Sequence, residues 1–216
     1  KIMGIKAFVV MPLGTPKVKR DAVLSYGAEV TDCAPNLWAR ETATQEIINK
    51  TGATALHPSN AMEVILGNAT ATMELLEEVP DLNGVMAPVG GGGLLAGTAL
   101  ATAHFGHNCH CWGAEPAAVD DAFRSLKMGS MQTNDQPNTI ADGLKTQLGS
   151  INFPIIQNGV ASIFCVDESE IIASMRLLWE RTKMVVEPSS AVALAAVLKY
   201  PAQFSGKKIG LILSGG

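Results

Sequence analysis

Short apolar runs alternate along this chain with longer segments in which apolar residues recur at helical spacing. The short runs predict β-strands, because they are rich in β-branched residues and are bounded by glycine and proline. The longer segments predict amphipathic helices. Such alternation favours an α/β fold with parallel sheets. The predicted strands cover residues 6–11, 28–31, 53–57, 85–89, 109–114, 162–166 and 208–213, and the predicted helices cover 16–26, 38–50, 62–79, 94–105, 119–127, 154–158, from Asp167 or Ser169 to 182, and 189–200.

The alternation divides the chain near residue 58. Residues 1–58 carry a βαβαβ pattern of a small domain, and residues 59–216 form a larger domain that we expect to bind a cofactor. Three strands are few for an independent domain, and neither end of the sequence resembles a natural terminus. We therefore expect two open parallel sheets that lack N-terminal strands, in a piece of a longer protein.

Four consecutive glycines at residues 90–93 separate an apolar run from a helix of small residues. Without Cβ atoms the backbone can turn sharply and approach a ligand, and the free N–H groups of the first helical turn then point at an anion. A phosphate monoester suits this arrangement. No Gly-Lys-Ser/Thr sequence follows, so the loop is not that of a nucleotide triphosphatase. The alternative, a flexible glycine linker, would usually have polar flanks.

Composition limits the possible partners. The 216 residues carry a formal net charge of −4, with 47% hydrophobic and 17% charged residues. This balance favours a globular protein with a sizeable core, and it favours neither nucleic acid nor an acidic membrane surface as a partner. No apolar run approaches the length of a membrane span, and we expect a cytoplasmic protein. The four cysteines form no CxxC pair and are expected to be reduced, and the four histidines form no metal-binding pattern.

Polar residues near predicted strand ends are further candidates. Ser214 follows the last strand, at the edge where open α/β sheets bind ligands, although a turn serine is an equally simple interpretation. Glu187 precedes Pro188 at a helix entrance, where it could serve as a cap.

Three carboxylates, Glu115, Asp120 and Asp121, lie within seven residues at another predicted strand end. Charges of one sign so close together repel each other unless a cation or another group offsets them. Hard oxygen ligands suit Mg²⁺ or Ca²⁺. Capping of the next helix by the two aspartates is the alternative.

Six motifs occur in one order along the chain: HPSN at 57–60, VGGGGLLAG at 89–97, AEP at 114–116, TIADGLK at 139–145, VEPSSA at 186–191 and LSGG at 213–216. In combination they resemble the pyridoxal-phosphate enzymes of the tryptophan-synthase β fold type, and within these the serine racemase and serine/threonine dehydratase family. The resemblance spans nearly the whole chain. It implies a fold type II enzyme with pyridoxal 5′-phosphate as cofactor, L-serine as substrate and a homodimeric assembly.

The resemblance also implies roles for single residues. The glycine loop and the N–H of Leu94 would hold the cofactor phosphate, Ser214 would bond to the pyridine nitrogen, and Glu187 would lie near the ring. Ser59 stands where serine racemase has a cofactor-contacting asparagine, so this contact is an open question. The residues implied for the cofactor are Ser59, Gly90, Gly91, Gly92, Gly93, Leu94, Glu187 and Ser214. The residues implied for Mg²⁺ or Mn²⁺ are Glu115, the carbonyl of Val119, and Asp121. The residues implied for an activating ATP at a subunit interface are Tyr26 and Lys183.

Two catalytic groups of the family have no match here. These are the lysine that holds the cofactor as a Schiff base and the serine on the opposite face of the ring. The resemblance places both upstream of Lys1, so we assign no catalytic residue within the chain. Lys17 and Lys19 match a later helix of the small domain instead.

The implied activity is racemisation of L-serine to D-serine, together with β-elimination that gives pyruvate and ammonia. One alternative is an L-threonine/L-serine dehydratase without racemisation, against which the carboxylate cluster argues mildly. Another is a non-catalytic phosphate-binding remnant, if the chain is complete as given.

Overall fold

The computed structural model describes residues 2–216, apart from the side chain of Leu37. The chain divides into two compact units, Lys1–Leu56 and His57–Gly216. The sequence analysis placed its boundary between residues 58 and 59. The division after Leu56 instead places the whole HPSN motif in the larger unit.

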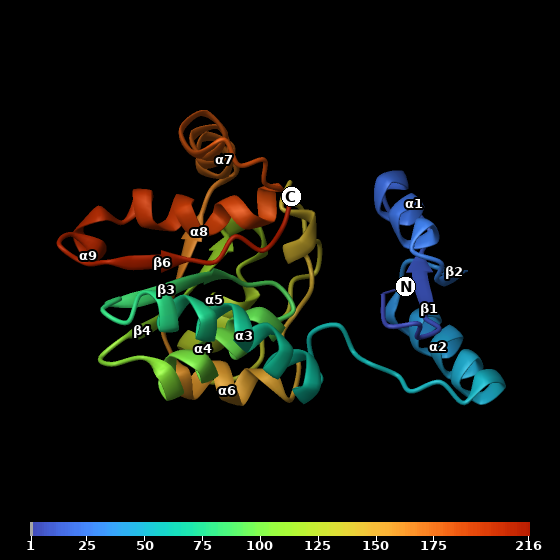
Figure 1. The fold of residues 1–216 in the computed structure, drawn as a ribbon. Coiled ribbons are helices and arrows are strands. Elements are labelled where there is room, and N and C mark those ends of the chain that lie inside the picture. Colours follow the sequence, from blue (N-terminus) through green and yellow to red (C-terminus); the bar gives the residue numbers. More distant parts are fainter. Residues whose placement is uncertain (1) are drawn as a thin grey trace. The chain divides into compact units, whose positions relative to one another are not determined.

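The first unit holds two parallel strands and two helices in its described part (Figure 1). The strands pair in register from Phe8 opposite Glu29 to Pro12 opposite Cys33. The predicted third strand at 53–57 is wrong, because these residues are largely exposed and have no neighbouring strand to take up their backbone hydrogen bonds. The elements are β1 (Phe8–Pro12), α1 (Lys17–Ser25), β2 (Glu29–Cys33) and α2 (Leu37–Thr51).

In the second unit the described strands form one parallel sheet in the order β5-β4-β3-β6. The predicted α/β class with parallel sheets is confirmed. The elements are α3 (Met62–Glu78), β3 (Gly84–Pro88), α4 (Gly93–Phe105), β4 (His110–Pro116), the 3₁₀ turn η1 (Ala117–Val119), α5 (Asp121–Met128), the 3₁₀ turn η2 (Asp142–Leu144), α6 (Asn152–Gly159), β5 (Val160–Val166), α7 (Glu168–Thr182), α8 (Pro188–Lys199), α9 (Pro201–Phe204) and β6 (Ile209–Leu211).

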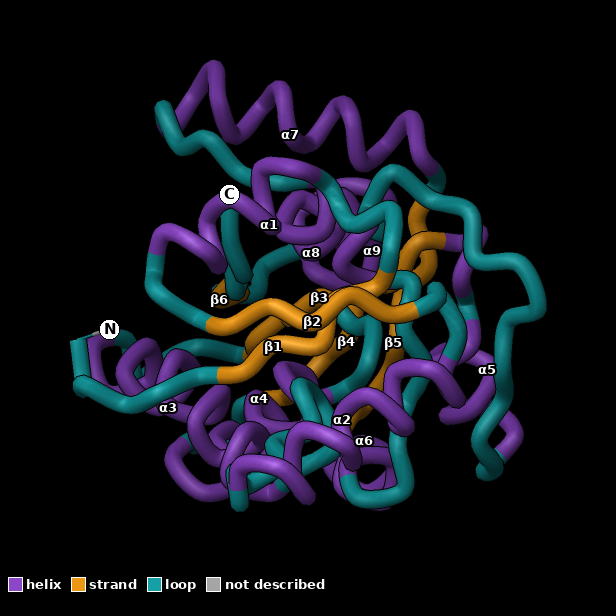
Figure 2. Tube along the Cα trace, turned by 90° about the vertical axis from the view of Figure 1, so that its right-hand side faces the viewer, coloured by secondary structure: helices purple, strands orange, loops and turns teal. Residues whose placement is uncertain are grey.

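Helices cover both faces of this sheet (Figures 1 and 2). Successive side chains of a strand point to opposite faces, so β3 supplies both hydrophobic cores. Val85 and Ala87 belong to the core that includes α3, α4 and α6, whereas Met86 belongs to the core that includes α7 and α8. Burial on both faces explains why β3 is apolar throughout rather than alternating.

Strand β4 is longer than predicted. Glu115 and Pro116 were expected to end it, but they pair with Cys165 and Val166 of β5. Proline is tolerated here because it occupies the last position of the strand. The longer pairing carries Glu115 into the sheet, where it is fully buried.

Several expectations about composition can be compared with the described residues. All four cysteines are free thiols, as predicted. Within residues 2–216 no helix has the length and apolar character needed to cross a bilayer. The same part of the chain holds no cluster of three or more histidine, cysteine, aspartate or glutamate side chains suited to a metal ion.

Candidate cofactor site

The glycine loop lies at the carboxyl end of β3. Val89 extends the strand by donating to the carbonyl of Ala114 at 2.9 Å, and the chain then turns through Gly92, which takes a φ of 84°. The bond from Ala96 N to Gly92 O, at 2.9 Å, opens the hydrogen-bond ladder of α4. The N–H groups just before Ala96, including that of Leu94, therefore have no acceptor within the helix. The arrangement is that of a helix N-terminus able to receive an anion.

None of the four loop glycines has room for a Cβ, because neighbouring segments lie too close. A Cβ on Gly90 would lie 2.7 Å from the Cα of Leu144, and one on Gly91 would lie 2.5 Å from Ser59 Oγ. A Cβ on Gly93 would lie 2.9 Å from the Cα of Ser59. The loop is thus packed between the HPSN motif and the IADGLK part of the TIADGLK motif, while the free N–H groups at the start of α4 are the donors that a phosphate monoester could use.

The IADGLK segment is fixed to two helices. Ile140 N donates to the Glu168 carboxylate at 2.9 Å, at the start of α7, and Gly143 N donates to Ser189 Oγ at 3.2 Å, in the first turn of α8. These bonds hold the segment beside Gly90. The long segment 129–149 therefore forms one wall of the candidate site, with η2 in it.

The end of the chain meets the start of α8. Glu187 N donates to Gly215 O at 3.1 Å, and Ser190 Oγ lies 3.2 Å from Ser214 Oγ. A Cβ on Gly143 would lie 3.8 Å from Glu187 Oε1, and a Cβ on Gly215 would lie 3.5 Å from the same atom. The structure thus places Glu187 between the IADGLK and LSGG motifs, with Ser214 beside them.

Two asparagines outside the predicted set connect these motifs. Asn152 is buried, and its Nδ2 donates to the carbonyls of Ser59 at 2.8 Å and Gly91 at 2.7 Å. Asn60 Oδ1 accepts from the backbone N–H groups of Ile151, at 2.8 Å, and Asn152, at 3.3 Å. Sequence reasoning missed both because the partners that join these motifs lie 61 to 93 residues away. The available signal was an asparagine at the start of an apolar helix.

The predicted cation residues form a separate group. Glu115 accepts from Ala122 N at 3.0 Å and Phe123 N at 2.9 Å, so it caps α5. The expected capping by the two aspartates is wrong, since the Asp120 side chain makes no capping bond and instead pairs with Arg124 at 2.8 Å. Glu115 can take this role because β4 runs on and points it at the first turn of the helix.

Asp121 keeps one oxygen free of hydrogen bonds. Its Oδ1 accepts from Asn134 Nδ2 at 2.5 Å, but its Oδ2 is buried without a partner. Burial raises the pKa of Asp121 to about 6, although backbone hydrogen bonds and Arg124 oppose the shift. Burial is also the main reason why the pKa of Glu115 lies well above its usual value, and the nearby charge of Asp121 raises this pKa further. Two buried carboxyls and an unpartnered oxygen fit a small hard cation, with Val119 at the end of η1 close by in sequence.

The residues expected to contact ATP lie in different units. Tyr26 caps the end of α1 and is 64% exposed. Lys183 follows α7 with a left-handed φ of 62°, and its Nζ donates to Glu180 O at 2.8 Å.

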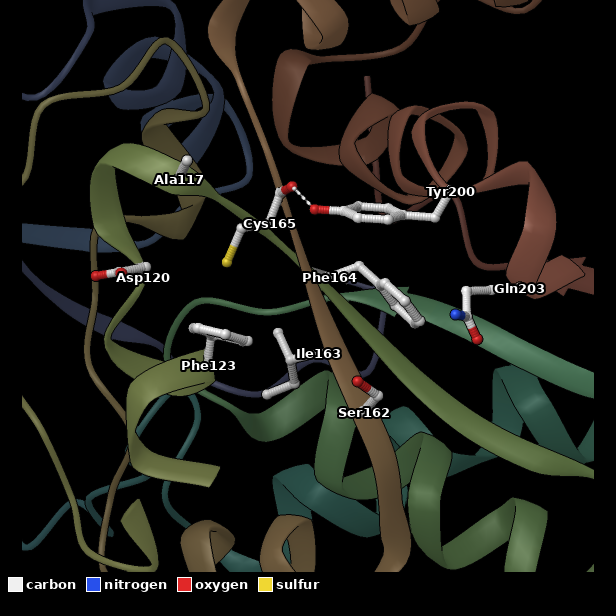
Figure 3. A pocket seen from close by; sticks show the side chains of 9 residues that line it. All are labelled: Ala117, Asp120, Phe123, Ser162, Ile163, Phe164, Cys165, Tyr200 and Gln203. Carbon is white, nitrogen blue, oxygen red and sulfur yellow. Dashed lines mark hydrogen bonds between the residues drawn. The ribbon is translucent and has the colours of Figure 1, made fainter. Parts of the chain in front are cut away.

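A pocket of about 450 Å³ opens at the edge strand β5, away from the predicted cofactor residues (Figure 3). Tyr200 donates its hydroxyl proton to the carbonyl of Cys165 at 2.9 Å across its rim. Desolvation is the main reason why the pKa of the Cys165 thiol is raised to about 12. The residues that line the pocket are Ala117, Asp120, Phe123, Ser162, Ile163, Phe164, Cys165, Tyr200 and Gln203.

Comparison with known proteins relates this geometry to a family. Residues 1–215 match the family described as pyridoxal-phosphate dependent enzymes. The chain is 44% identical to serine racemase of Dictyostelium discoideum, over 100% of this chain and 68% of that protein. The crystal structure of that racemase superposes with a TM-score of 0.93 at 43% identity, covering 100% of this chain and 70% of the other.

Two dehydratases are similar as well. The chain is 40% identical to β-hydroxyaspartate dehydratase of Paracoccus denitrificans, over 100% of this chain and 68% of that protein. It superposes on the crystal structure of a threonine deaminase from T.th. with a TM-score of 0.91 at 42% identity, covering 100% of this chain and 71% of the other. The chain therefore spans about two thirds of the length of these relatives. A match over residues 1–215, with the glycine loop at the centre of the site, makes this chain a member of the pyridoxal-phosphate dependent enzyme family.

Proposed function

We propose that this chain carries the phosphate- and ring-binding part of a serine racemase that also eliminates water from serine. The products would be D-serine on one route, and pyruvate with ammonia on the other. The observation that carries the proposal is the glycine loop packed against the HPSN and IADGLK motifs, together with 44% identity to a serine racemase.

When bound, pyridoxal 5′-phosphate supplies an electron sink for a carbanion at the substrate Cα. The residues at 90–93 and the N–H of Leu94 would hold its phosphate through backbone donors. Ser214 would bond to the ring nitrogen as a neutral hydroxyl. A hydroxyl does not keep that nitrogen protonated as a carboxylate would, so the sink is weaker, which suits racemisation and elimination. Ser59, beside Gly91 and Gly93, and Glu187, beside Gly143, would also line the site.

A dehydratase without racemisation is the second candidate. It is supported by the similarity to a β-hydroxyaspartate dehydratase and to a threonine deaminase. The two candidates share the site and differ in whether the Cα proton returns to the opposite face. The substrate can also distinguish the two candidates. A dehydratase that acts on β-hydroxyaspartate needs a cationic or amide partner for the second carboxylate of this substrate, whereas serine has no such group.

Mg²⁺ or Mn²⁺ is proposed as a structural and activating ion. The unpartnered Oδ2 of Asp121 and the carbonyl of Val119 would be ligands, with Glu115 as the third group. Oxygen ligands of this kind are those that hard divalent cations prefer. Such an ion would compensate two carboxyls whose burial disfavours their charge.

A homodimer with ATP at the subunit interface is proposed from the family resemblance. The exposed side of α7 and the segment after it support an interface, since Ile172, Trp179 and Val185 are large apolar residues that remain 56%, 64% and 76% exposed. Lys183 lies between them in sequence. Tyr26 would be the second ATP contact, and the cytoplasm the proposed location.

The test uses the purified full-length protein. An intact mass well above 22.6 kDa, with a visible absorption band that borohydride abolishes, would support the cofactor assignment. Chiral analysis of L-serine incubations should then detect D-serine, and a coupled assay should detect pyruvate. Pyruvate without D-serine would favour the dehydratase, with L-threonine and β-hydroxyaspartate as competing substrates. A protein without the band and without turnover would contradict both candidates.

A further inference from the structure

We infer that Asn152 is a positioning residue for the cofactor phosphate: its buried amide fixes the direction of the peptide groups in the glycine loop. The inference deepens the proposed function and rests on it. Asn152 lies outside all six sequence motifs, and its side chain bonds to backbone groups of the chain.

The Asn152 side chain uses both of its amide protons and its oxygen. Nδ2 donates to Ser59 O at 2.8 Å and to Gly91 O at 2.7 Å, while Oδ1 accepts from Gly149 N at 3.0 Å. The reversed amide would set its oxygen against two carbonyl oxygens, so the bonding pattern fixes its orientation. One fully buried side chain thus joins three separate segments.

The connection is reciprocal. Asn60 Oδ1 accepts from the N–H groups of Ile151 and Asn152, while Asn152 bonds to the carbonyl of the residue before Asn60. Gly149 has to be glycine here, because a Cβ on it would collide with the Asn60 amide. We call these contacts between 59–60 and 149–152 the asparagine clasp. These contacts fix the backbone of Asn152, so that its side chain can hold Gly91 O in place.

The bond to Gly91 determines where the loop's donors point. In a trans peptide the C=O and the next N–H lie on opposite sides, and the described chain holds no cis peptide bond. With Gly91 O directed at Asn152, the N–H of Gly92 must point to the side of the loop opposite Asn152. A phosphate there meets an N–H donor instead of a carbonyl oxygen, whose partial charge would repel it.

The chain provides a substitution that removes this restraint with little change in shape. Asn152→Asp keeps the acceptor for Gly149 but replaces the donors with an oxygen that faces two carbonyls. The Gly91 peptide is then free to turn, and a negative charge is added near a dianion. Asn158→Asp is the matched control, because it makes the same change on an exposed residue of the same helix.

The test measures dissociation constants of the full-length apoprotein for pyridoxal 5′-phosphate and for pyridoxal, which lacks the phosphate. We expect N152D to lose roughly tenfold or more in affinity for the phosphorylated compound, with pyridoxal affinity within about twofold of wild type. N158D should leave both affinities unchanged. N152S, which keeps one donor and adds no charge, is taken through the same comparison, and it stands alone if N152D does not fold by circular dichroism.

The outcomes separate the possibilities. A folded variant that keeps both affinities would overturn the role of Asn152. Equal losses for both compounds would also overturn it, because they indicate general damage. If the wild-type protein binds neither compound, the proposed function itself fails and this inference falls with it. A selective loss for the phosphorylated compound in N152D and also in the uncharged N152S, absent in N158D, would support it.

Discussion

The hydroxyl oxygens of Ser190 and Ser214 lie 3.2 Å apart, where the start of α8 meets the segment that follows β6. Ser190 donates its proton to Gly215 O at 2.6 Å and accepts from Gly215 N at 2.8 Å. A hydroxyl carries one proton, so Ser214 must be the donor in the contact between the two serines. Ser214 is therefore a neutral group whose proton points at Ser190 Oγ, and a bond from Ser214 to a ring nitrogen would have to replace this contact.

Removing the Ser214 hydroxyl should weaken cofactor binding without unfolding the protein. A neutral hydrogen bond contributes about 0.5–1.5 kcal/mol, so Ser214→Ala is expected to lower the affinity for pyridoxal 5′-phosphate by up to about tenfold. The dissociation constant of the full-length apoprotein checks this. Ser169→Ala, on the exposed first turn of α7, is the control. Equal affinity in S214A and wild type would exclude a bond from Ser214 to the cofactor.

A methyl group on the glycine loop should be costly, whereas one on α3 should not. Gly92 has a positive φ, and its Cβ would lie 2.6 Å from Leu148 Cδ2 and 2.7 Å from Asn152 Oδ1. Gly92→Ala is therefore expected to lower the free energy of unfolding by about 1–3 kcal/mol. Gly67 lies in α3 with nothing within 4 Å of a Cβ. Gly67→Ala should raise stability by about 0.5–1 kcal/mol.

Denaturant unfolding of both variants measures the difference. The two substitutions add the same methyl group, so the contrast isolates the surroundings of the loop. A Gly92→Ala variant as stable as wild type would mean that the loop can shift away from Leu148 and Asn152. The close packing described for the site would then not be required for folding.

The sequence was most informative where local pattern and tertiary environment agree. The buried strand β3, the glycine turn and α4 were predicted to within one residue, because an apolar run, a glycine turn and a helix of small residues each limit the backbone locally. The segment 53–57 was mistaken for a strand because a short apolar run does not show whether a neighbouring strand is present to pair with it. Strand formation there depended on pairing that the described unit does not supply.

The site shows the same division. The motifs predicted a site at the glycine loop, Glu187 and Ser214. In the structure Gly143 lies beside both Gly90 and Glu187, and Ser214 lies beside Ser190 at the start of α8. Asn152 escaped because its role comes from contacts with distant backbone groups, which no local spacing encodes. Glu115 was assigned to a strand end, and its capping of α5 became visible only with the full length of β4.

The thiols of the half-buried Cys165 and the buried Cys111 should react only as far as they ionise or become accessible. Cys165 borders the pocket at β5, and the raised pKa of its thiol, about 12, leaves almost no thiolate at pH 8. Its alkylation by iodoacetamide should be slow and should speed up about tenfold per pH unit below that pKa. Cys111 is fully buried, which raises its pKa further, and should react only after unfolding.

Mass spectrometry of the alkylated peptides at several pH values provides the measurement. The same reaction in denaturant is the control, in which all thiols should react at similar rates. Rapid labelling of Cys165 at pH 7 would show that its surroundings favour the thiolate, contrary to the burial seen at β5.

Removal of divalent cations should make the stability depend on pH through Asp121. Its pKa is raised by burial from 3.8 to about 6, so between these values the folded state binds more protons than the unfolded state. The free energy of unfolding of the chelated protein therefore has a component that falls as pH rises from about 4 to about 6, and that loss persists at neutral pH. Because Mg²⁺ binds the carboxylate and not the carboxylic acid, its stabilising effect should be larger at pH 7.5 than at pH 5.

Asp121→Asn tests this directly, because it removes the charge and keeps the shape. The variant should lose most of the rise in melting temperature that Mg²⁺ gives to wild type, and its chelated form should lack the component that falls between pH 4 and 6. Asp135→Asn, an exposed change in the segment between α5 and η2, should leave both measurements as in wild type. A Mg²⁺ effect that survives in the Asp121 variant would place the cation elsewhere, and Asp121 would then be a buried carboxyl that takes up its proton below about pH 6.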